Sequence, residues 1–449
     1  MINLRESLRQ ATPSQSLLLG FTLIILAGSI LLTLPISSSK GVSQPFIDAL
    51  FTATSAISTT GLTVVDTGSF YSLFGQIVIL LLIQIGGLGY MVFIVFAALA
   101  IGRKVPLRTG AILENSISGA TFANAKRFAV LTVLFTFLFE FVAAAILSLY
   151  WMREFPASRS IYLGIFHSIS GFCTAGFGLF SDNLCSCEGS VVVNLTISLL
   201  CIAGAIGFFV LIDTYDFLRN MATHTHPRRF SIHSRLALGM SMMLMVIGAA
   251  VILFAEKGLS SRPLGDRLLA SVFQSVSAST TTGYNTIDIG AMSSTSLFVM
   301  ILLMFVGASP GSTGGGIKTT TFALMLLFTV AAWRGREQVV IFWRRIPAET
   351  VRKAFAIGVS AILLVVFATL ILAISEKASF LQILFEVVSG FGNVGLSTGI
   401  TSGLTAVGKV VIILTMLAGR LGPLAIGFAL VGRAEPAPLG YVDEPVFVG

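Results

Sequence analysis

The hexapeptide Ser58-Thr59-Thr60-Gly61-Leu62-Thr63 is a small-polar stretch in an otherwise apolar chain, and it recurs. Thr280-Thr281-Thr282-Gly283-Tyr284-Asn285 repeats it closely. Two looser copies are Cys173-Thr174-Ala175-Gly176-Phe177-Gly178 and Gly392-Asn393-Val394-Gly395-Leu396-Ser397. The four glycines are 115, 107 and 112 residues apart, so the period is about a quarter of the chain. A period this long indicates an internal duplication rather than a solenoid.

The composition is that of a membrane protein. Of 449 residues, 55% are hydrophobic and 11% are charged, with a mean hydropathy of +0.93, whereas about 25% of residues are charged in soluble proteins. The net charge of +8 does not indicate nucleic-acid binding, because the basic residues lie in short loops between apolar runs. Residues 1–16 show no small-residue cleavage pattern after a short apolar core, so we expect no removable signal peptide.

Each copy of the hexapeptide lies between two long apolar segments and directly follows a short one. The short segments are 45–58, 160–171, 266–277 and 380–389. About 14 residues of helix rise only about 20 Å, less than the roughly 30 Å of a bilayer core, so a short segment must leave by the side it entered. The long segments, each predicted to be a full span, are 15–35, 73–101, 128–151, 191–218, 236–254, 297–333, 355–374 and 406–431.

These patterns predict an all-α membrane protein built from four covalently linked helix–pore loop–helix repeats. It has eight transmembrane helices and four re-entrant pore helices around one central pore. The predicted repeats are 1–110, 111–222, 223–345 and 346–449. Basic residues are concentrated in the termini and in the loops between repeats, so the positive-inside rule makes both termini cytoplasmic and turns the four hexapeptides outward.

We interpret the hexapeptides as an ion filter. Irregular backbone at membrane depth is tolerated where it is buried in protein or lines water, and rings of carbonyl oxygens can replace the hydration shell of a cation. The alternative is a helix stop and turn, which is the commoner meaning of such a motif seen once. Asp66 and Asp288 each lie five residues after a motif glycine, so selectivity by carbonyls rather than by a carboxylate ring is our hypothesis. The predicted filter residues are Thr59, Thr60, Gly61, Thr174, Ala175, Gly176, Thr281, Thr282, Gly283, Asn393, Val394 and Gly395.

With these motifs the chain resembles, over essentially its whole length, the Trk/Ktr/HKT superfamily of potassium transporters. It is most similar to the KtrB-type membrane subunits of bacterial Ktr systems, given eight spans, no additional N-terminal helix pair and a short C-terminus. The resemblance implies that Gly61, Gly176, Gly283 and Gly395 are the filter glycines. Sodium-selective plant HKT relatives carry serine at the first of these positions, so glycine at all four favours potassium.

The resemblance also implies partners and location. It implies a homodimer with one pore per subunit, in a bacterial inner membrane. It further implies potassium uptake stimulated by sodium and a cytoplasmic KtrA-like ring of nucleotide-binding regulatory subunits. Potassium would be the substrate, bound by the filter carbonyls, sodium would be an activator, and no cofactor would be covalently bound. The alternative is a Trk- or HKT-like transporter that conducts sodium or other monovalent cations.

Residues 306–318 interrupt the second span of the third repeat with five glycines and Pro310, so the helix must break. The sequence is no Walker A loop, because Ile317 separates Gly316 from Lys318 and no strand precedes it. A nucleotide-binding membrane enzyme is therefore an unfavoured alternative, and a simple kink is another. The resemblance implies an intramembrane gate loop beneath the filter. The predicted gate residues are Gly311, Ser312, Thr313, Gly314, Gly315, Gly316 and Arg420.

Arg420 lies in the middle of the last predicted span. A guanidinium in hydrocarbon is costly, so it must face a partner or a water-filled cavity. Our hypothesis is that Arg420 limits cation passage electrostatically and holds the gate loop through its carbonyls. A structural ion pair with Glu140 or Asp213 is the alternative. No nucleophile–base pair, metal cluster or carboxylate dyad recurs in the spans, so we expect no enzyme activity.

Overall fold

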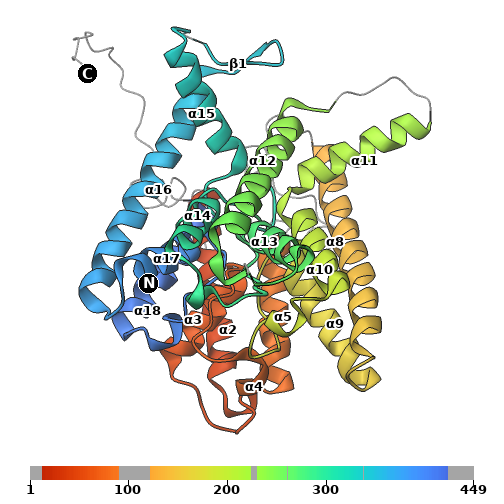
Figure 1. The fold of residues 1–449 in the computed structure, drawn as a ribbon, viewed down its shortest axis with the longest axis vertical. Helices are drawn as coiled ribbons and strands as arrows, with labels where there is room; N and C mark the ends of the chain where they lie inside the picture. Colours follow the sequence, from red (N-terminus) through yellow and green to blue (C-terminus); the bar gives the residue numbers. More distant parts are fainter. Residues whose placement is uncertain (1–12, 90–121, 224–229, 260, 337, 423–449) are drawn as a thin grey trace, which may run out of the picture.

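The computed structural model describes residues 13–89, 122–223, 230–259, 261–336 and 338–422. The regular secondary structure of these residues is helical apart from one short hairpin, which confirms the predicted all-α class for this part of the chain. In Figure 1 the long helices α8, α12 and α16 run along the molecule, and shorter helices are gathered between them. The predicted repeat boundary at 110/111 lies outside the described residues, as do Arg5, Arg9 and Arg103, which supported the orientation.

Each motif follows a long helix and a short helix and precedes another helix. The long helices that precede the short ones, which we call outer helices, are α2 (Pro13–Thr33), α8 (Phe122–Trp151), α12 (Ile232–Ala255) and α16 (Ala348–Ser375). The short helices are α3 (Phe46–Ile57), α9 (Ala157–Phe172), α13 (Leu264–Ser279) and α17 (Phe380–Gly392). The inner helices after each motif are α5 (Leu73–Leu88), α10 (Val191–Ala205), α14 (Ser294–Phe305) and α18 (Ala406–Leu421). Further elements are α4 (Thr67–Phe70), α11 (Phe208–Ala222), α15 (Thr319–Trp333), β1 (Val340–Ile341) and β2 (Arg344–Arg345).

Local start signals recur in the four copies. The inner helices begin at a hydroxyl that accepts a hydrogen bond from the amide three residues later, which satisfies one of the unpaired first-turn donors. These caps are Ser72, Ser190, Ser293 and Thr405. Three short helices follow a proline and the fourth has a capping box, at Pro45, Pro156, Pro263 and Ser379 respectively. The duplication therefore extends from the motif to the helix boundaries.

Among the described residues, three helical stretches are individually long and apolar enough to cross a membrane: Arg127–Trp151, Ile232–Ala255 and Ala348–Ser375. The bent pair α10 and α11 could form a fourth span. Apolar side chains such as Phe141, Phe254 and Ile374 point outward from the long helices, as lipid-facing residues do. The short helices α3 and α17, of 12 and 13 residues, rise about 20 Å and cannot cross a bilayer core of about 30 Å. The predicted number of eight spans stays a prediction, because α5 and α18 end at the edges of the described ranges.

One predicted span is wrong in its continuity. Residues 191–218 were expected to form a single helix, but α10 ends at Ala205 and α11 leaves at 99° to it. The bend lies at Gly207, whose φ is +95°, and the amide of Phe208 donates instead to the carbonyl of Gly311, 2.9 Å away. An acceptor from the glycine-rich segment thus replaces a helical one. Gly89 and Gly422 have positive φ values at the ends of α5 and α18.

The helices pack in a cyclic order. Within each copy the short helix contacts its own outer and inner helices. Each inner helix also contacts the short helix of the next copy: α5 with α9, α10 with α13, α14 with α17, and α18 with α3. The last contact joins the end of the described chain to its beginning. The core therefore surrounds the four motifs rather than lying to one side of them.

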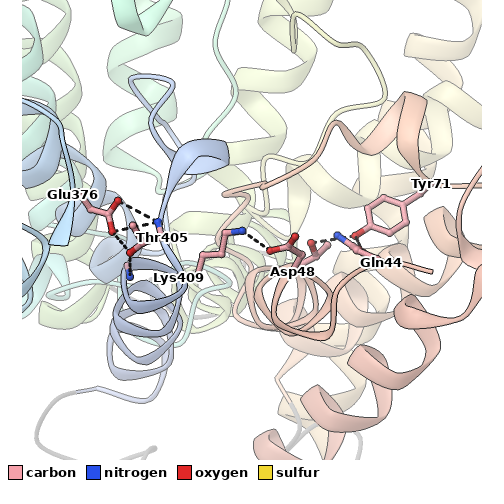
Figure 2. A network of polar contacts seen from close by, with 8 residues as sticks. Gln44, Asp48, Tyr71, Glu376, Thr405 and Lys409 are labelled. Atoms are coloured by element: carbon pink, nitrogen blue, oxygen red, sulfur yellow. Dashed lines mark hydrogen bonds and ion pairs between the residues drawn. The ribbon is translucent and has the colours of Figure 1, made fainter. Parts of the chain in front are cut away.

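Polar contacts reinforce this last contact, where no peptide linker joins the two copies (Figure 2). Lys409 Nζ in α18 lies 2.6 Å from Asp48 Oδ1 in the first turn of α3. On the α18 side, the Glu376 carboxylate accepts from the Thr405 hydroxyl at 2.6 Å and holds the start of the helix. On the α3 side, the Tyr71 hydroxyl donates to Gln44 Oε1 at 2.7 Å. The ion pair thus connects two segments that are themselves anchored.

We expect Lys409→Met to lower the free energy of unfolding by about 1–3 kcal/mol, because it leaves the mostly buried Asp48 carboxylate unpaired. The measurement is thermal unfolding of the purified chain in detergent. The double variant Lys409→Met, Asp48→Leu should recover most of the loss, since it removes the unpaired charge. If the double variant is as unstable as Lys409→Met, the ion pair does not stabilise this contact.

Candidate functional site

The four motif glycines, far apart in sequence, come together in one ring. A Cβ added to any of them would lie against a backbone carbonyl oxygen of the next copy. The contacts are Gly61 with Ala175, Gly176 with Thr282, Gly283 with Val394, and Gly395 with Thr60. Because the fourth copy meets the first, the ring is closed. Only glycine allows backbone to approach backbone this closely at these positions.

The backbone takes the same path in each copy. The residue two positions before the glycine has a left-handed φ: 56° at Thr59, 52° at Thr174, 57° at Thr281 and 53° at Asn393. For β-branched threonine this conformation is a genuine outlier that costs of order 1–3 kcal/mol. In each copy, the amide of the residue directly before the glycine donates a hydrogen bond to a serine carbonyl of the short helix. The four distances are 2.7–2.9 Å. Those bonds hold the strained turn.

A serine six residues before each glycine braces the loop through its side chain, and sequence analysis missed it. Ser55 and Ser389 accept hydrogen bonds from the amides of Gly61 and Gly395, at 3.0 and 3.1 Å. The other two donate to the carbonyl of the residue after the glycine: Ser170 to Phe177 at 2.9 Å and Ser277 to Tyr284 at 2.6 Å. Aligning the four copies on their glycines would have revealed this register, together with a buried phenylalanine ten residues before each glycine: Phe51, Phe166, Phe273 and Phe385.

A second polar position, nine residues before each glycine, braces the chain that follows the motif. The residues differ between copies, but each bonds a group of that following segment. The contacts are Thr52 with the Tyr71 hydroxyl, His167 with the Leu179 amide, Gln274 with the Thr286 amide, and Glu386 with the Ser397 hydroxyl. The buried His167 ring also bonds the Leu163 carbonyl at 2.8 Å through its other nitrogen, Nδ1.

The nearest carboxylates downstream of the first and third motif glycines are engaged in local structure. Asp66 accepts from the Ser69 amide at 2.7 Å and caps α4. Asp288 accepts from the Gly290 amide at 2.9 Å and caps a turn of 3-10 helix. Neither carboxylate is needed to build the glycine ring, whose closest groups are backbone carbonyls. Both carboxylates therefore serve as caps of the segments that follow the motifs.

The glycine-rich segment 306–318 lies against all four motif copies. The Thr313 carbonyl accepts from the Thr59 hydroxyl at 3.0 Å, and the Thr313 hydroxyl lies 3.1 Å from that of Thr174. A Cβ on Gly314 would meet Thr281, and one on Gly315 would meet the Asn393 side chain. Three consecutive residues thus touch the first, second, third and fourth copies. The structure thus brings residues of the predicted filter and of the predicted gate together.

The same segment is fixed to the end of α10. The amides of Ser309 and Thr313 donate to the carbonyls of Ala205 and Gly204, at 3.0 and 3.2 Å. Gly311 is exposed and Ser312 is half-buried, while Gly316, with a φ of 70°, lies against Gly392. In a continuous α10–α11 helix, the carbonyls of Gly204 and Ala205 would accept hydrogen bonds from amides of that helix. Here they accept from the segment instead. The bend in the second copy and the interruption in the third are therefore one structural feature.

Two cations hold the segment from outside the ring. The Arg420 guanidinium donates to the carbonyls of Thr313 and Gly86, which joins the fourth copy to the third and the first. The alternative ion pairs are not what the structure shows, since Glu140 accepts from Gln84 and Asp213 accepts from Ser234. Lys318 Nζ donates to Gly314 O at 2.6 Å, a role that sequence analysis missed. The Lys318 ammonium is thus bound within its own loop.

The position of Arg420 is special to the fourth copy. Glycines of three inner helices lie against a carbonyl in the last turn of the short helix of the same copy: Gly86 on Ile57, Gly204 on Phe172 and Gly419 on Phe391. The residues that follow these glycines are Gly87, Ala205 and Arg420. Small residues occupy the first two positions and a guanidinium the third. Of these three copies, the fourth alone supplies a positive charge at this position.

A model of the TrkH family, described as a cation transport protein, matches residues 6–432. The crystal structure of the potassium transporter TrkH from Vibrio parahaemolyticus covers 94% of this chain and 86% of its own, with a TM-score of 0.73 and 20% identity. That likeness establishes the shared fold. Fold and family together define a helical, multi-pass membrane transporter of cations, and not an enzyme.

The chain belongs to the TrkH family. Among its relatives, the Ktr system potassium uptake protein B of Bacillus subtilis is 41% identical over 98% of this chain and 97% of its own. The protein of the same name from Vibrio alginolyticus is 37% identical over 96% and 94%. The potassium/sodium uptake protein NtpJ of Enterococcus hirae is 35% identical, and the match covers 98% of each chain.

We expect Ser389→Ala to lower the free energy of unfolding by about 1–3 kcal/mol, because the amide of Gly395 loses its acceptor in a closely packed loop. Ser29→Ala is a matched control, since the buried Ser29 hydroxyl bonds only a carbonyl of its own helix turn. Its effect should remain within about 0.5 kcal/mol. Thermal unfolding in detergent measures both, and equal losses would show that the serine does not brace the motif.

Proposed function

We propose that this chain is the potassium-translocating membrane subunit of a Ktr-type uptake system. The observation that carries the proposal is the closed ring of four glycines, each in contact with a carbonyl of the next copy. Near-full-length relatives named for potassium uptake support potassium as the substrate. The name of the NtpJ relative supports sodium linkage, and conduction of sodium or other monovalent cations is the second candidate function.

The finer architecture that we propose is four helix–pore loop–helix repeats, with eight spans and four re-entrant pore helices around one pore. The cyclic packing of inner helices on successive short helices supports it. The repeated caps and the repeated backbone path of the motifs support it as well. The C-terminal ends of the short helices carry partial negative charge toward the motifs, which favours a cation there.

Selectivity in this proposal comes from neutral oxygens. The carbonyls of Thr60, Ala175, Thr282 and Val394 lie within the ring, and such oxygens can substitute for the water around a potassium ion. The buried serines limit the movement of the loops, so the ring resists the contraction that a smaller ion would require. Selectivity by carbonyls needs no fixed charge, which fits the capping roles of Asp66 and Asp288.

The segment 311–316 is the gate in this proposal. It lies against every copy of the motif and is held by the Arg420 guanidinium and the Lys318 ammonium. Passage then requires the loop to withdraw, which breaks the bonds of Thr313 to Thr59 and Thr174. Arg420 also adds a positive charge near the path, and this charge opposes the accumulation of cations.

Regulation and assembly complete the proposal. We infer a homodimer in a bacterial inner membrane, with both termini cytoplasmic and a KtrA-like nucleotide-binding ring bound there. Two relatives are named as potassium uptake proteins B and D of a Ktr system. These names describe each protein as one component of a system, which supports such a partner. The excess of basic residues in the termini and inter-repeat loops supports the orientation.

Gly283→Ser should reduce the preference for potassium over sodium by tenfold or more, because a Cβ at this position would meet the carbonyl of Val394 and deform the ring. The measurement is ion flux into proteoliposomes with each ion alone, together with rescue of a potassium-uptake-deficient bacterium. Gly399→Ser is the matched control: Gly399 has a similar φ of 95°, but no atom lies within 4 Å of its Cβ position. If both variants retain the potassium preference, the ring is not the filter.

Arg420→Ala should raise potassium flux about tenfold, equivalent to lowering the barrier by about 1.4 kcal/mol. The change removes both a positive charge and the restraint on the Thr313 carbonyl. Deletion of residues 311–316 should raise basal flux too, and Arg219→Ala, at an exposed arginine of α11, should leave flux unchanged. Unchanged flux in both the Arg420 variant and the deletion would rule out a gate at this segment.

A further inference from the structure

Residues 338–345, between α15 and α16, form a small hairpin that has no part in the filter or the gate proposed above. Strands β1 and β2 pair antiparallel, with Val340 opposite Arg345 and Ile341 opposite Arg344. Figure 1 shows β1 at the upper end of the molecule, beside the end of α15. Val339 and Ile341 are buried in a cluster with Val351 and Ala354 of α16. The hairpin is therefore held in place by its own apolar face.

The tip of this hairpin has an unfavourable choice of residues. Phe342 and Trp343 form the two-residue turn, with φ values of 49° and 64°. A turn with two positive φ values strongly prefers Asn-Gly, and bulky side chains there are strained. Trp343 is 99% exposed and Phe342 is 55% exposed, so little burial within the chain compensates. Because the fold does not require this strained turn, the two aromatic residues suggest an interaction with another molecule.

The surroundings of the tip are basic and aromatic. Residues 334–353 contain six basic and two acidic side chains. Arg344 and Arg345 follow the tip directly, the Arg235 guanidinium lies 5.1 Å from the Phe342 ring centre, and Trp333 is 82% exposed. Exposed tryptophan with arginine beside the end of an apolar helix is typical of a membrane interface. The candidate span α16 begins at Ala348, three residues after Arg345, which puts the hairpin at that level.

A cavity of about 350 Å³ lies between the hairpin and the two helices. Its apolar wall is formed by Phe328, Val339, Val351 and Phe355, and the side chains of Arg345 and Arg352 also line it. Guanidinium groups bind phosphate with paired hydrogen bonds. An apolar cavity next to two such groups has the chemistry to hold an acyl chain and the phosphate of the same molecule.

We propose that the hairpin 338–345 and this cavity form a binding site for an anionic phospholipid. The headgroup phosphate binds Arg345 and Arg352, an acyl chain enters the cavity, and Phe342 and Trp343 lie at headgroup level. An acidic soluble partner would satisfy the charge, but it would not account for an apolar cavity beside the start of a span. The site is independent of the filter, of the gate and of which membrane face is cytoplasmic.

The first test measures lipid binding by native mass spectrometry of the full chain in detergent, with phosphatidylglycerol and phosphatidylcholine as probes. Arg345→Gln with Arg352→Gln should weaken phosphatidylglycerol binding roughly tenfold to thirtyfold, about fivefold for each arginine. The matched control is Arg153→Gln with Arg159→Gln, which likewise removes two arginines; these lie over the aromatic rings of Tyr150 and Phe155. Equal weakening in both variants, or no weakening in the first, overturns the proposal.

The second test separates the aromatic tip from folding. Phe342→Asn with Trp343→Gly installs the residues that this turn prefers, so thermal stability in lipid-free detergent should rise. Phosphatidylglycerol binding should fall, and quenching of tryptophan fluorescence by brominated phosphatidylglycerol should decrease relative to the unmodified chain. Unchanged quenching overturns the proposal. Protection of Trp343 from a soluble quencher by a soluble partner protein, but not by phosphatidylglycerol, also overturns it.

Discussion

The structure depends on the close approach of backbone to backbone at Gly61, Gly176, Gly283 and Gly395. At each point the carbonyl of one copy occupies the space where a Cβ of the preceding copy would lie. The ring is consequently a set of mutual constraints, since displacing one loop displaces its neighbour. The serines beneath the loops and the left-handed turns before the glycines maintain this geometry. A ring of neutral oxygens can discriminate between ions only if its dimensions are held in this way.

The copies share a backbone path but have diverged in their tasks. The third copy interrupts its inner helix and supplies the segment beneath the ring. The second copy provides carbonyls at the end of α10 to bind that segment, and bends at Gly207 as a result. The fourth copy supplies Arg420, at a level where the first and second have Gly87 and Ala205. The copies thus differ because the segment of the third copy contacts different groups on different sides. The second copy provides carbonyl acceptors for its amides, and the fourth provides a guanidinium for its Thr313 carbonyl.

Much of the fold could be predicted from local signals. The lengths of the apolar segments distinguished the short helices from the outer helices. The repeated glycine gave the positions of all four loops. The bend at Gly207 could not be predicted from residues 191–218 alone, because its cause is an acceptor at Gly311, far away in sequence. The role of Lys318 depends likewise on how the loop folds back on itself. The bracing serines, by contrast, could have been found from the sequence by aligning the four copies on their glycines.

The segment around Thr313 is a single element in contact with four different loops. In a pore built from four identical chains, four equivalent gates could move separately, and opening would show subunit cooperativity. Here a single displacement of the segment would break its contacts with the first, second, third and fourth loops together. If this segment closes the pore, each chain opens in a single step, and any cooperativity in transport must arise between chains rather than within one.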